Sequence, residues 1–144
     1  MISITILKKA DAKALKEIRI LLLELRSDMK KISGTLAELQ TIASDPNVVF
    51  CIAKDGSRIV GMGVLYIVRK VGRSQSHIED VVVLREYRGQ GIGTALLKKL
   101  IAVARPKRVD MIELTSNPRK TAANKLYQKL GFKRRETNVY KITL

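Results

Sequence analysis

The sequence predicts an α/β fold with α+β character, in which a mixed, partly antiparallel central sheet of about six strands is flanked by about four helices. Two observations predict it. In the first half of the chain, a tight Asp55-Gly56 turn joins two apolar runs of strand length, which indicates an antiparallel hairpin. In the second half, segments of helical periodicity separate the strands and require parallel crossover connections. We therefore expect the order βααβββαβαβ in a single domain over residues 1–144.

A strand and two helices begin the chain. Residues Met1–Leu7 alternate between apolar and polar side chains, as in a strand. Asp11 is a suitable N-cap for a helix whose apolar residues recur at helical spacing. Thr35 and Glu38 have the spacing of a capping box, so we expect a second helix to begin there and to end at Asp45-Pro46.

A hairpin and a polar loop come next. The two strands of the hairpin are expected over Val48–Ala53 and Arg58–Val68. Gly61 and Gly63 interrupt the second strand, and glycines inside a strand indicate a β-bulge or the close approach of another backbone. Residues 69–76 are polar, contain a glycine, and are expected to form an exposed loop.

Residues 77–100 predict a strand, a glycine-rich turn and a helix. The β-branched run Val81–Val83 has the length and composition of a strand. Apolar residues at helical spacing extend from Ile92 to Leu100. Between them, the turn Arg88–Gly93 exposes backbone N–H groups at the positive end of the helix dipole. Such a turn binds anions, and most often a phosphate.

A strand, a helix and a final strand complete the chain. A short buried strand is expected over Val109–Thr115. Asn117-Pro118 then begins a helix, with Asn at the cap and Pro in the first turn, and Gly131 ends it as a left-handed C-cap. Residues Asn138–Leu144 alternate again and predict the last strand of the sheet.

The overall composition restricts the class of protein. Lys and Arg number 28 against 13 Asp and Glu, and the net charge of +15 favours anionic ligands such as a phosphorylated cofactor, nucleic acid or the ribosome. Aromatic residues make up only 4%, so platforms for base stacking are scarce and nucleic acid is the less favoured partner. One Cys and one His argue against a disulfide framework or a bound transition metal. Cys51 lies in an expected strand, where a buried structural thiol is the ordinary interpretation.

Location follows from two further features of the sequence. No apolar run is long enough to span a membrane. The first residues alternate like a strand and lack the layout of a signal peptide. We therefore expect a cytoplasmic protein.

Two motifs resemble those of a known family. Arg88-x-x-Gly91-x-Gly93, between a strand and a helix, resembles the acyl-CoA pyrophosphate motif of the GNAT superfamily of N-acetyltransferases. Residues 117–132 resemble the second signature of that family, which ends in Leu-Tyr-x-x-x-Gly-Phe. The expected order of elements also matches the family. Residues 77–93 are especially similar to the polyamine and amino-sugar-phosphate acetyltransferase branches, and the small-amine and antibiotic acetyltransferases are also close.

The resemblance implies that acetyl-CoA is the donor of the acetyl group and that an amine is the acceptor. It implies that the N–H of Val81 lies near the acetyl oxygen, while the following valines pair with the pantetheine arm like an added strand. It also implies that backbone N–H groups of the turn hold the pyrophosphate and that an asparagine of the second motif contacts CoA. The cofactor-binding residues expected on this basis are Val81, Val82, Val83, Arg88, Gly89, Gln90, Gly91, Ile92, Gly93, Thr94, Asn117, Asn124 and Tyr127.

The expected catalytic residues are Glu79, Val81 and Tyr127. Glu79 is our candidate for the general base, acting through water, because it precedes the expected oxyanion donor by two residues and the polyamine branch carries Glu at the matching position. His77 would share its face of a regular strand, and Asp80 would point to the other face unless a bulge intervened. Tyr127 matches the family tyrosine that can protonate the thiolate, and it can equally be an amphipathic residue that covers the core.

The sequence leaves the acceptor open. We expect a primary amine of a small molecule that attacks the thioester directly in a ternary complex. The alternatives are a protein acetyltransferase, acting on Lys or on N-terminal amines such as those of ribosomal proteins, and a non-enzymatic module that binds nucleic acid or the ribosome. The expected strand over Val139–Leu144 could pair two copies of the chain, so a homodimer is a further expectation.

Overall fold

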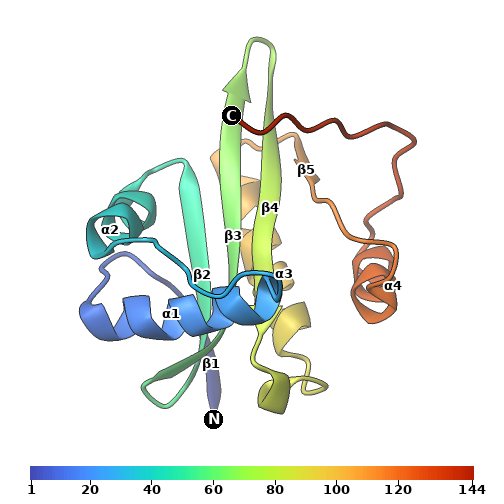
Figure 1. The fold of residues 1–144 in the computed structure, drawn as a ribbon. Coiled ribbons are helices and arrows are strands. Elements are labelled where there is room, and N and C mark those ends of the chain that lie inside the picture. The colour runs from blue at the N-terminus through green and yellow to red at the C-terminus, as the bar shows by residue number, and fades with distance from the viewer. The chain divides into compact units, whose positions relative to one another are not determined.

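The computed structural model describes residues 1–144, which divide into a first unit, residues 1–114, and a second unit, residues 115–144 (Figure 1). The strands of the first unit are β1 (Ile2–Ile6), β2 (Val48–Asp55), β3 (Arg58–Lys70), β4 (Arg73–Val83) and β5 (Met111–Glu113). Its helices are α1 (Ala12–Leu25), α2 (Leu36–Ser44) and α3 (Ile92–Ala104), with 3₁₀ turns over Arg85–Tyr87 and Arg105–Lys107. The second unit holds α4 (Thr121–Lys129).

The sheet of the first unit is mixed, as predicted. Its strands lie in the order β1-β2-β3-β4-β5, and every neighbouring pair is antiparallel except β4 and β5, which are parallel. The helices α1 and α2 cross one face, and α3 packs against the other (Figure 1). The predicted α/β class with a mixed central sheet is therefore confirmed, with five strands in place of the expected six or so.

Local signals in the sequence form the expected caps. Asp11 accepts a hydrogen bond from the N–H of Ala14 at 2.7 Å and begins α1. Thr35 and Glu38 form the predicted capping box at the start of α2. Each cap satisfies an N–H group that has no partner within its own helix, which fixes where the helix begins. None of the helices is long and apolar enough to cross a membrane.

The two glycines of β3 allow α3 to pack closely on the sheet. A Cβ atom at Gly61 would lie 3.3 Å from Leu96 Cδ1, and one at Gly63 would lie 3.3 Å from Leu100 Cδ1. Both leucines are completely buried, so larger side chains in β3 would push the helix away. The register of β3 against β4 also shifts next to Gly63, as in a β-bulge. Of the two features that these glycines indicated, the bulge is present, and the close approach is that of leucine side chains.

The exposed loop expected over residues 69–76 was wrong. β3 and β4 run through these residues and pair as far as Lys70 and Arg73. The connection is a turn of Val71 and Gly72, in which Gly72 has a φ of 81°. A hairpin needs only two residues for its turn, so the polar composition of the strand ends concealed a continuous hairpin.

The helix expected from Asn117-Pro118 begins later, at Thr121. Asn117 Oδ1 accepts the N–H of Arg119 at 2.9 Å, and the Asn117 carbonyl accepts the N–H of Lys120 at 3.0 Å. These bonds close a separate turn around Pro118. An Asn side chain can cap such a turn as readily as it caps a helix, and the local sequence does not distinguish the two.

The final strand expected over Asn138–Leu144 was also wrong. Residues 133–144 form neither helix nor strand. The alternating apolar side chains are exposed, with Val139 75% and Ile142 83% accessible. A strand forms where its backbone N–H and C=O groups meet those of a neighbour. Side-chain alternation specifies a face of a strand without specifying that neighbour.

Candidate active site

The glycine-rich turn leads from β4 to the start of α3. Gly89 and Gly91 have φ values of 77° and 78°, in the left-handed region that favours glycine. Gly91 is the N-cap of α3, and no side chain caps the first N–H groups of the helix. A Cβ atom at either glycine would meet nothing within 4 Å, so the space in front of the turn is open. The N–H groups of Ile92, Gly93 and Thr94 can therefore bind an anion at the positive end of the helix dipole.

Side-chain hydrogen bonds hold the residues at the start of the glycine-rich turn. Arg88 and Gln90 are exposed on the turn, and Arg88 Nε donates to the Val83 carbonyl at 2.9 Å. The Tyr87 hydroxyl donates to Asp55 at 2.9 Å. This bond is the largest cause both of the lowered pKa of the Asp55 carboxyl and of the raised pKa of the Tyr87 phenol. The connection between strand and helix is thus fixed to the β2–β3 hairpin.

One edge of β4 is open along Val81–Val83, the residues expected to bind acetyl-CoA. β5 pairs with β4 only at residues 75–77. Beyond them, residues 78–83 have β3 on one side and no strand on the other. Val82 is buried here, whereas Val81 and Val83 are half-buried. Backbone N–H and C=O groups on an open edge can pair with an extended ligand, as an added strand would.

Two carboxylates lie at the bulge in β4. Glu79 is exposed and opposite Val64 of β3. Asp80 has a φ of 54°, a conformation that costs most non-glycine residues about 1–2 kcal/mol and that Asp tolerates better than most. Asp80 Oδ1 lies 3.3 Å from Nη2 of Arg26, which follows α1. The strand is therefore not regular at Asp80, and the Asp80 carboxylate reaches the end of α1.

Tyr66 interacts with Glu79 and Asp80, which we call the carboxylate cluster, and it was not predicted from the sequence. It lies opposite His77 in the register of β3 and β4. Burial is the largest cause of the raised pKa of its phenol, followed by the negative charges of Asp80 and Glu79, while Arg26 acts in the opposite direction. The charges of Glu79 and Asp80 thus act on the Tyr66 phenol, and His77 lies opposite Tyr66 on the neighbouring strand. No local pattern of the sequence marks Tyr66, because it meets the carboxylates through the register of β3 and β4.

The other predicted site residues lie in the second unit. Asn124 Nδ2 donates to the Asn117 carbonyl at 3.0 Å, so both asparagines hold the turn before α4. Tyr127 is half-buried, and burial raises the pKa of its phenol. Its ring packs edge-on against Phe132, with 6.1 Å between the ring centroids. Gly131 has a φ of 97° between them, as predicted for the end of the helix.

Cys51 is completely buried in β2. Burial raises the pKa of its thiol to about 11, and the positive charge of Lys99 acts in the opposite direction. The reactive thiolate is therefore scarce at neutral pH, which supports a structural role. No group of three or more His, Cys, Asp or Glu side chains is placed to hold a metal ion.

The sequence matches the Acetyltransferase (GNAT) family over residues 15–132. A glucosamine 6-phosphate N-acetyltransferase of Trypanosoma brucei brucei is 38% identical over 106 residues, which are 72% of this chain and 69% of that protein. A thialysine N-epsilon-acetyltransferase of Mus musculus is 36% identical over 77 residues, which are 53% and 45% of the two chains. An aminoalkylphosphonate N-acetyltransferase of Salmonella typhimurium is 32% identical over 91 residues, or 62% and 59%.

Solved structures share the fold. The crystal structure of an acetyltransferase from Trypanosoma brucei aligns with a TM-score of 0.79 at 28% identity, over 99% of this chain and 100% of that one. An aminoglycoside acetyltransferase from an uncultured soil sample aligns with a TM-score of 0.85 at 24% identity, over 100% and 99%. At that lower identity, the second likeness concerns the fold alone.

Proposed function

The chain belongs to the GNAT family of acetyltransferases, and we propose that it transfers the acetyl group of acetyl-CoA to a primary amine of a small molecule. The amine attacks the thioester directly in a ternary complex, and no acyl-enzyme forms. One observation carries this proposal. Within residues 79–94, a carboxylate cluster, an open strand edge and an uncapped helix start follow one another. Each of these features supplies one requirement of acetyl transfer.

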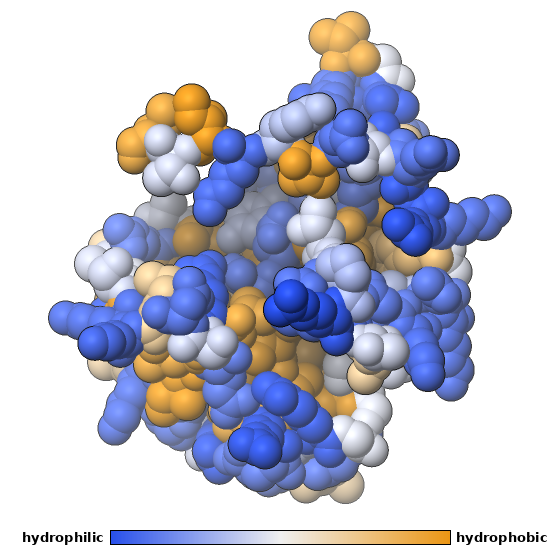
Figure 2. Space-filling view, turned by 45° about the vertical axis from the view of Figure 1, so that its right-hand side comes forward, coloured by the Kyte–Doolittle hydropathy of each residue, from blue (hydrophilic) through white to orange (hydrophobic).

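The turn and the strand edge serve the donor. The diphosphate of CoA binds the backbone N–H groups of Gly89–Thr94, with Arg88 and Gln90 beside them. The pantetheine arm runs along the open edge of β4 at Val82 and Val83. This places the thioester near the N–H of Val81, which stabilises the negative charge that develops on the acetyl oxygen. The net charge of +15, and the hydrophilic side chains over much of the face in Figure 2, suit a polyphosphorylated cofactor.

The carboxylate cluster serves the acceptor. An amine reaches the enzyme as an ammonium and must lose a proton before it can attack. Glu79 is exposed, so a water molecule can relay that proton to its carboxylate. Asp80 adds a second carboxylate, which is paired with Arg26 at 3.3 Å, and the Tyr66 phenol, whose pKa is raised chiefly by burial, is neutral at neutral pH.

Tyr127 supplies the proton that the leaving thiolate needs. Its phenol, whose pKa burial raises, is neutral at neutral pH and so carries the proton that it would donate. Asn117 and Asn124 lie in the same unit and provide further contacts to CoA.

The names of the relatives support a small acceptor. They acetylate, by name, glucosamine 6-phosphate, thialysine and aminoalkylphosphonates. Each of these compounds carries an amino group on a small molecule. We therefore place the amino-sugar phosphates, amino acids and phosphonates ahead of proteins as acceptors.

A panel of acceptors tests this function. The purified protein is mixed with acetyl-CoA and one amine of each of these three kinds, or with a lysine-containing peptide, and free thiol is followed over time. We expect CoA release above background with at least one small amine. If the peptide is the only acceptor that causes CoA release, the chain is a protein acetyltransferase. If none of the acceptors causes CoA release above background, the proposed activity is overturned.

We also propose that two copies pair through residues 138–144. This segment alternates as an edge strand would, and its apolar side chains are exposed, Tyr140 by 88% and Ile142 by 83%. Pairing with a strand of a second copy would satisfy its backbone and cover these side chains. Light scattering should give twice the monomer mass for the full chain and the monomer mass after removal of residues 138–144. A monomer at high concentration of the full chain would contradict the pairing.

A further inference from the structure

One carboxylate ties the last turn of α1 to the glycine-rich turn. Glu24 Oε2 accepts the backbone N–H of Arg85 at 3.1 Å and lies 3.0 Å from Nη2 of Arg88. The Glu24 side chain is 28% exposed and that of Arg88 53%, so both bonds lie at the surface. Arg85 begins the 3₁₀ turn in the connection that follows β4, and Arg88 begins the glycine motif. Glu24 therefore holds both ends of this connection.

Arg88 transmits the restraint to the end of β4. Its Nε donates to the Val83 carbonyl at 2.9 Å while its Nη2 binds Glu24. A guanidinium group is planar and rigid, so two bonds in different directions fix its position. Gly89 follows Arg88 directly, and its left-handed conformation therefore starts from a residue that cannot move freely.

We propose that Glu24 is a positioning residue for the cofactor, an inference that rests on the proposed use of acetyl-CoA. Glu24 acts through Arg85 and Arg88. By holding them, it keeps residues 89–94 in the conformation whose N–H groups face the diphosphate, so the turn does not have to become ordered when CoA binds. Ordering a flexible turn on binding lowers affinity by the conformational entropy that is lost.

A direct electrostatic effect would have the opposite sign. Glu24 carries a negative charge beside a site for an anion, and it engages the guanidinium of Arg88. If charge alone mattered, removal of Glu24 would free Arg88 to bind phosphate, and CoA would bind more tightly. If positioning matters more, removal of Glu24 weakens CoA binding. The sign of the change therefore distinguishes the two.

The same end of α1 also contacts the carboxylate cluster, through a different residue. Arg26 makes the ion pair with Asp80 at 3.3 Å. Substitution of Glu24 leaves this pair intact, so the effect should fall on acetyl-CoA and not on the amine. A general loss of structure would affect both substrates.

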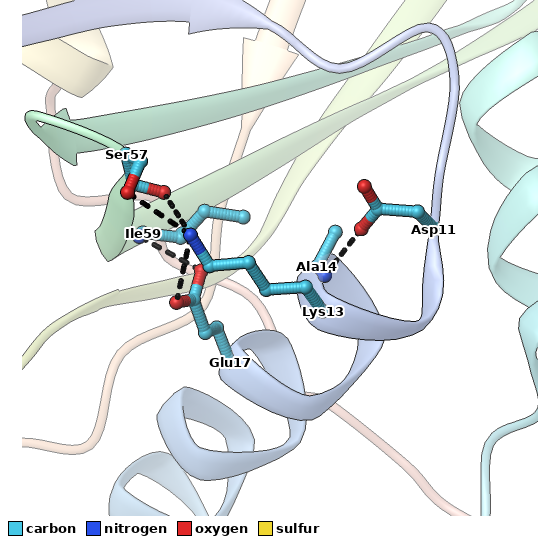
Figure 3. A network of polar contacts seen from close by, with 6 residues as sticks. All are labelled: Asp11, Lys13, Ala14, Glu17, Ser57 and Ile59. Carbon is cyan, nitrogen blue, oxygen red and sulfur yellow. Dashed lines mark hydrogen bonds and ion pairs between the residues drawn. The ribbon is translucent and has the colours of Figure 1, made fainter.

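Glu17 provides a matched control on the same helix. Its Oε2 accepts the backbone N–H of Ile59 at 3.0 Å, and its Oε1 lies 4.0 Å from Nζ of Lys13 (Figure 3). Glu17 thus makes the same two kinds of contact as Glu24, a backbone hydrogen bond and an ion pair, with β3 in place of the glycine-rich turn. Glu17→Ala should lower the melting temperature about as much as Glu24→Ala does.

The test compares Glu24→Ala, Glu24→Gln and Glu17→Ala with the unmodified chain, by the KM of each substrate and by calorimetric titration with CoA. We expect Glu24→Ala to raise the KM of acetyl-CoA and the Kd of CoA about tenfold, as for the loss of a hydrogen bond to a charged group. Glu24→Gln keeps an oxygen for the N–H of Arg85 and should raise both about threefold. The KM of the amine should not change in either variant, and Glu17→Ala should change neither KM.

An unchanged or lower Kd of CoA in both Glu24 variants would overturn the proposal, as would an equal rise in Glu17→Ala. Glu24→Gln decides the matter if the alanine variant does not fold. If the unmodified chain binds CoA but acetylates no amine, the proposed function fails, and calorimetry with CoA alone still tests the role of Glu24.

Discussion

Replacement of Gly91 by alanine separates the conformational role of the glycine-rich turn from its proposed role as a phosphate cradle. Gly91 has a φ of 78°, and its missing Cβ would meet no atom within 4 Å. An alanine there displaces no protein atom, so the free energy of unfolding should fall only by the cost of the left-handed backbone, about 1 kcal/mol. The methyl group occupies the open space through which the diphosphate approaches the N–H groups of α3. We therefore expect the KM of acetyl-CoA to rise at least about tenfold.

Gly72 offers a matched control for this substitution. It has a φ of 81° in the β3–β4 turn, and its missing Cβ also meets nothing within 4 Å. Gly72→Ala should therefore lower the free energy of unfolding by the same amount, about 1 kcal/mol, without changing the KM of acetyl-CoA. Urea denaturation and steady-state kinetics of both variants measure the two quantities. Equal KM values of acetyl-CoA in the two variants would refute the binding of the diphosphate by the glycine-rich turn. A much larger loss of stability in Gly91→Ala than in Gly72→Ala would show that the space beside Gly91 is not open.

Other substitutions and titrations test the remaining parts of the account. Glu79→Gln should lower kcat about 100-fold and leave the KM of acetyl-CoA unchanged, and an unaltered kcat would exclude Glu79 as the base. Leu100→Ala should lower the free energy of unfolding in urea by about 3 kcal/mol, because Leu100 is completely buried, and a loss below about 1 kcal/mol would mean that the core beneath α3 is loose. The pKa values of Tyr66 and Tyr127 are raised in the folded chain above the ordinary tyrosine pKa of 10.0. The two protonated phenols therefore contribute to the stability of the fold below pH 10.0, and this contribution is lost as pH rises through the raised pKa values. Absorbance of the folded chain should show both phenols titrating above that value, and titration below it would contradict their burial. Cys51, with a pKa of about 11, should be alkylated at neutral pH only in denaturant, and rapid alkylation of the folded chain would contradict its burial.

Features that depend on neighbouring residues were predictable from the sequence. The capping box of Thr35 and Glu38 forms because its two partners are three positions apart. Gly131 ends α4 in the left-handed conformation, as predicted, because glycine lacks the side chain that disfavours it. These local rules were sufficient to locate the β2–β3 hairpin, the starts of α1 and α2 and the turn before α3, and they misplaced the start of α4.

Features that join distant parts of the chain were not predictable in this way. Asp80 and Arg26 are 54 positions apart, and Arg88 and Glu24 are 64 apart. Their meeting depends on where α1 crosses the sheet, which no local pattern encodes. Tyr66 was missed for the same reason, because it meets the carboxylates only through the register of β3 against β4. The prediction of a last strand over Asn138–Leu144 was wrong because the alternation of apolar and polar residues does not specify a partner strand.

Initial velocities of CoA release, measured over a matrix of acetyl-CoA and amine concentrations, test the central claim most directly. Direct attack in a ternary complex requires both substrates to be bound before any product leaves. We predict that double-reciprocal plots at different amine concentrations intersect, and that no CoA is released without amine. Parallel lines together with a burst of CoA in the absence of amine would show an acyl-enzyme and contradict the account.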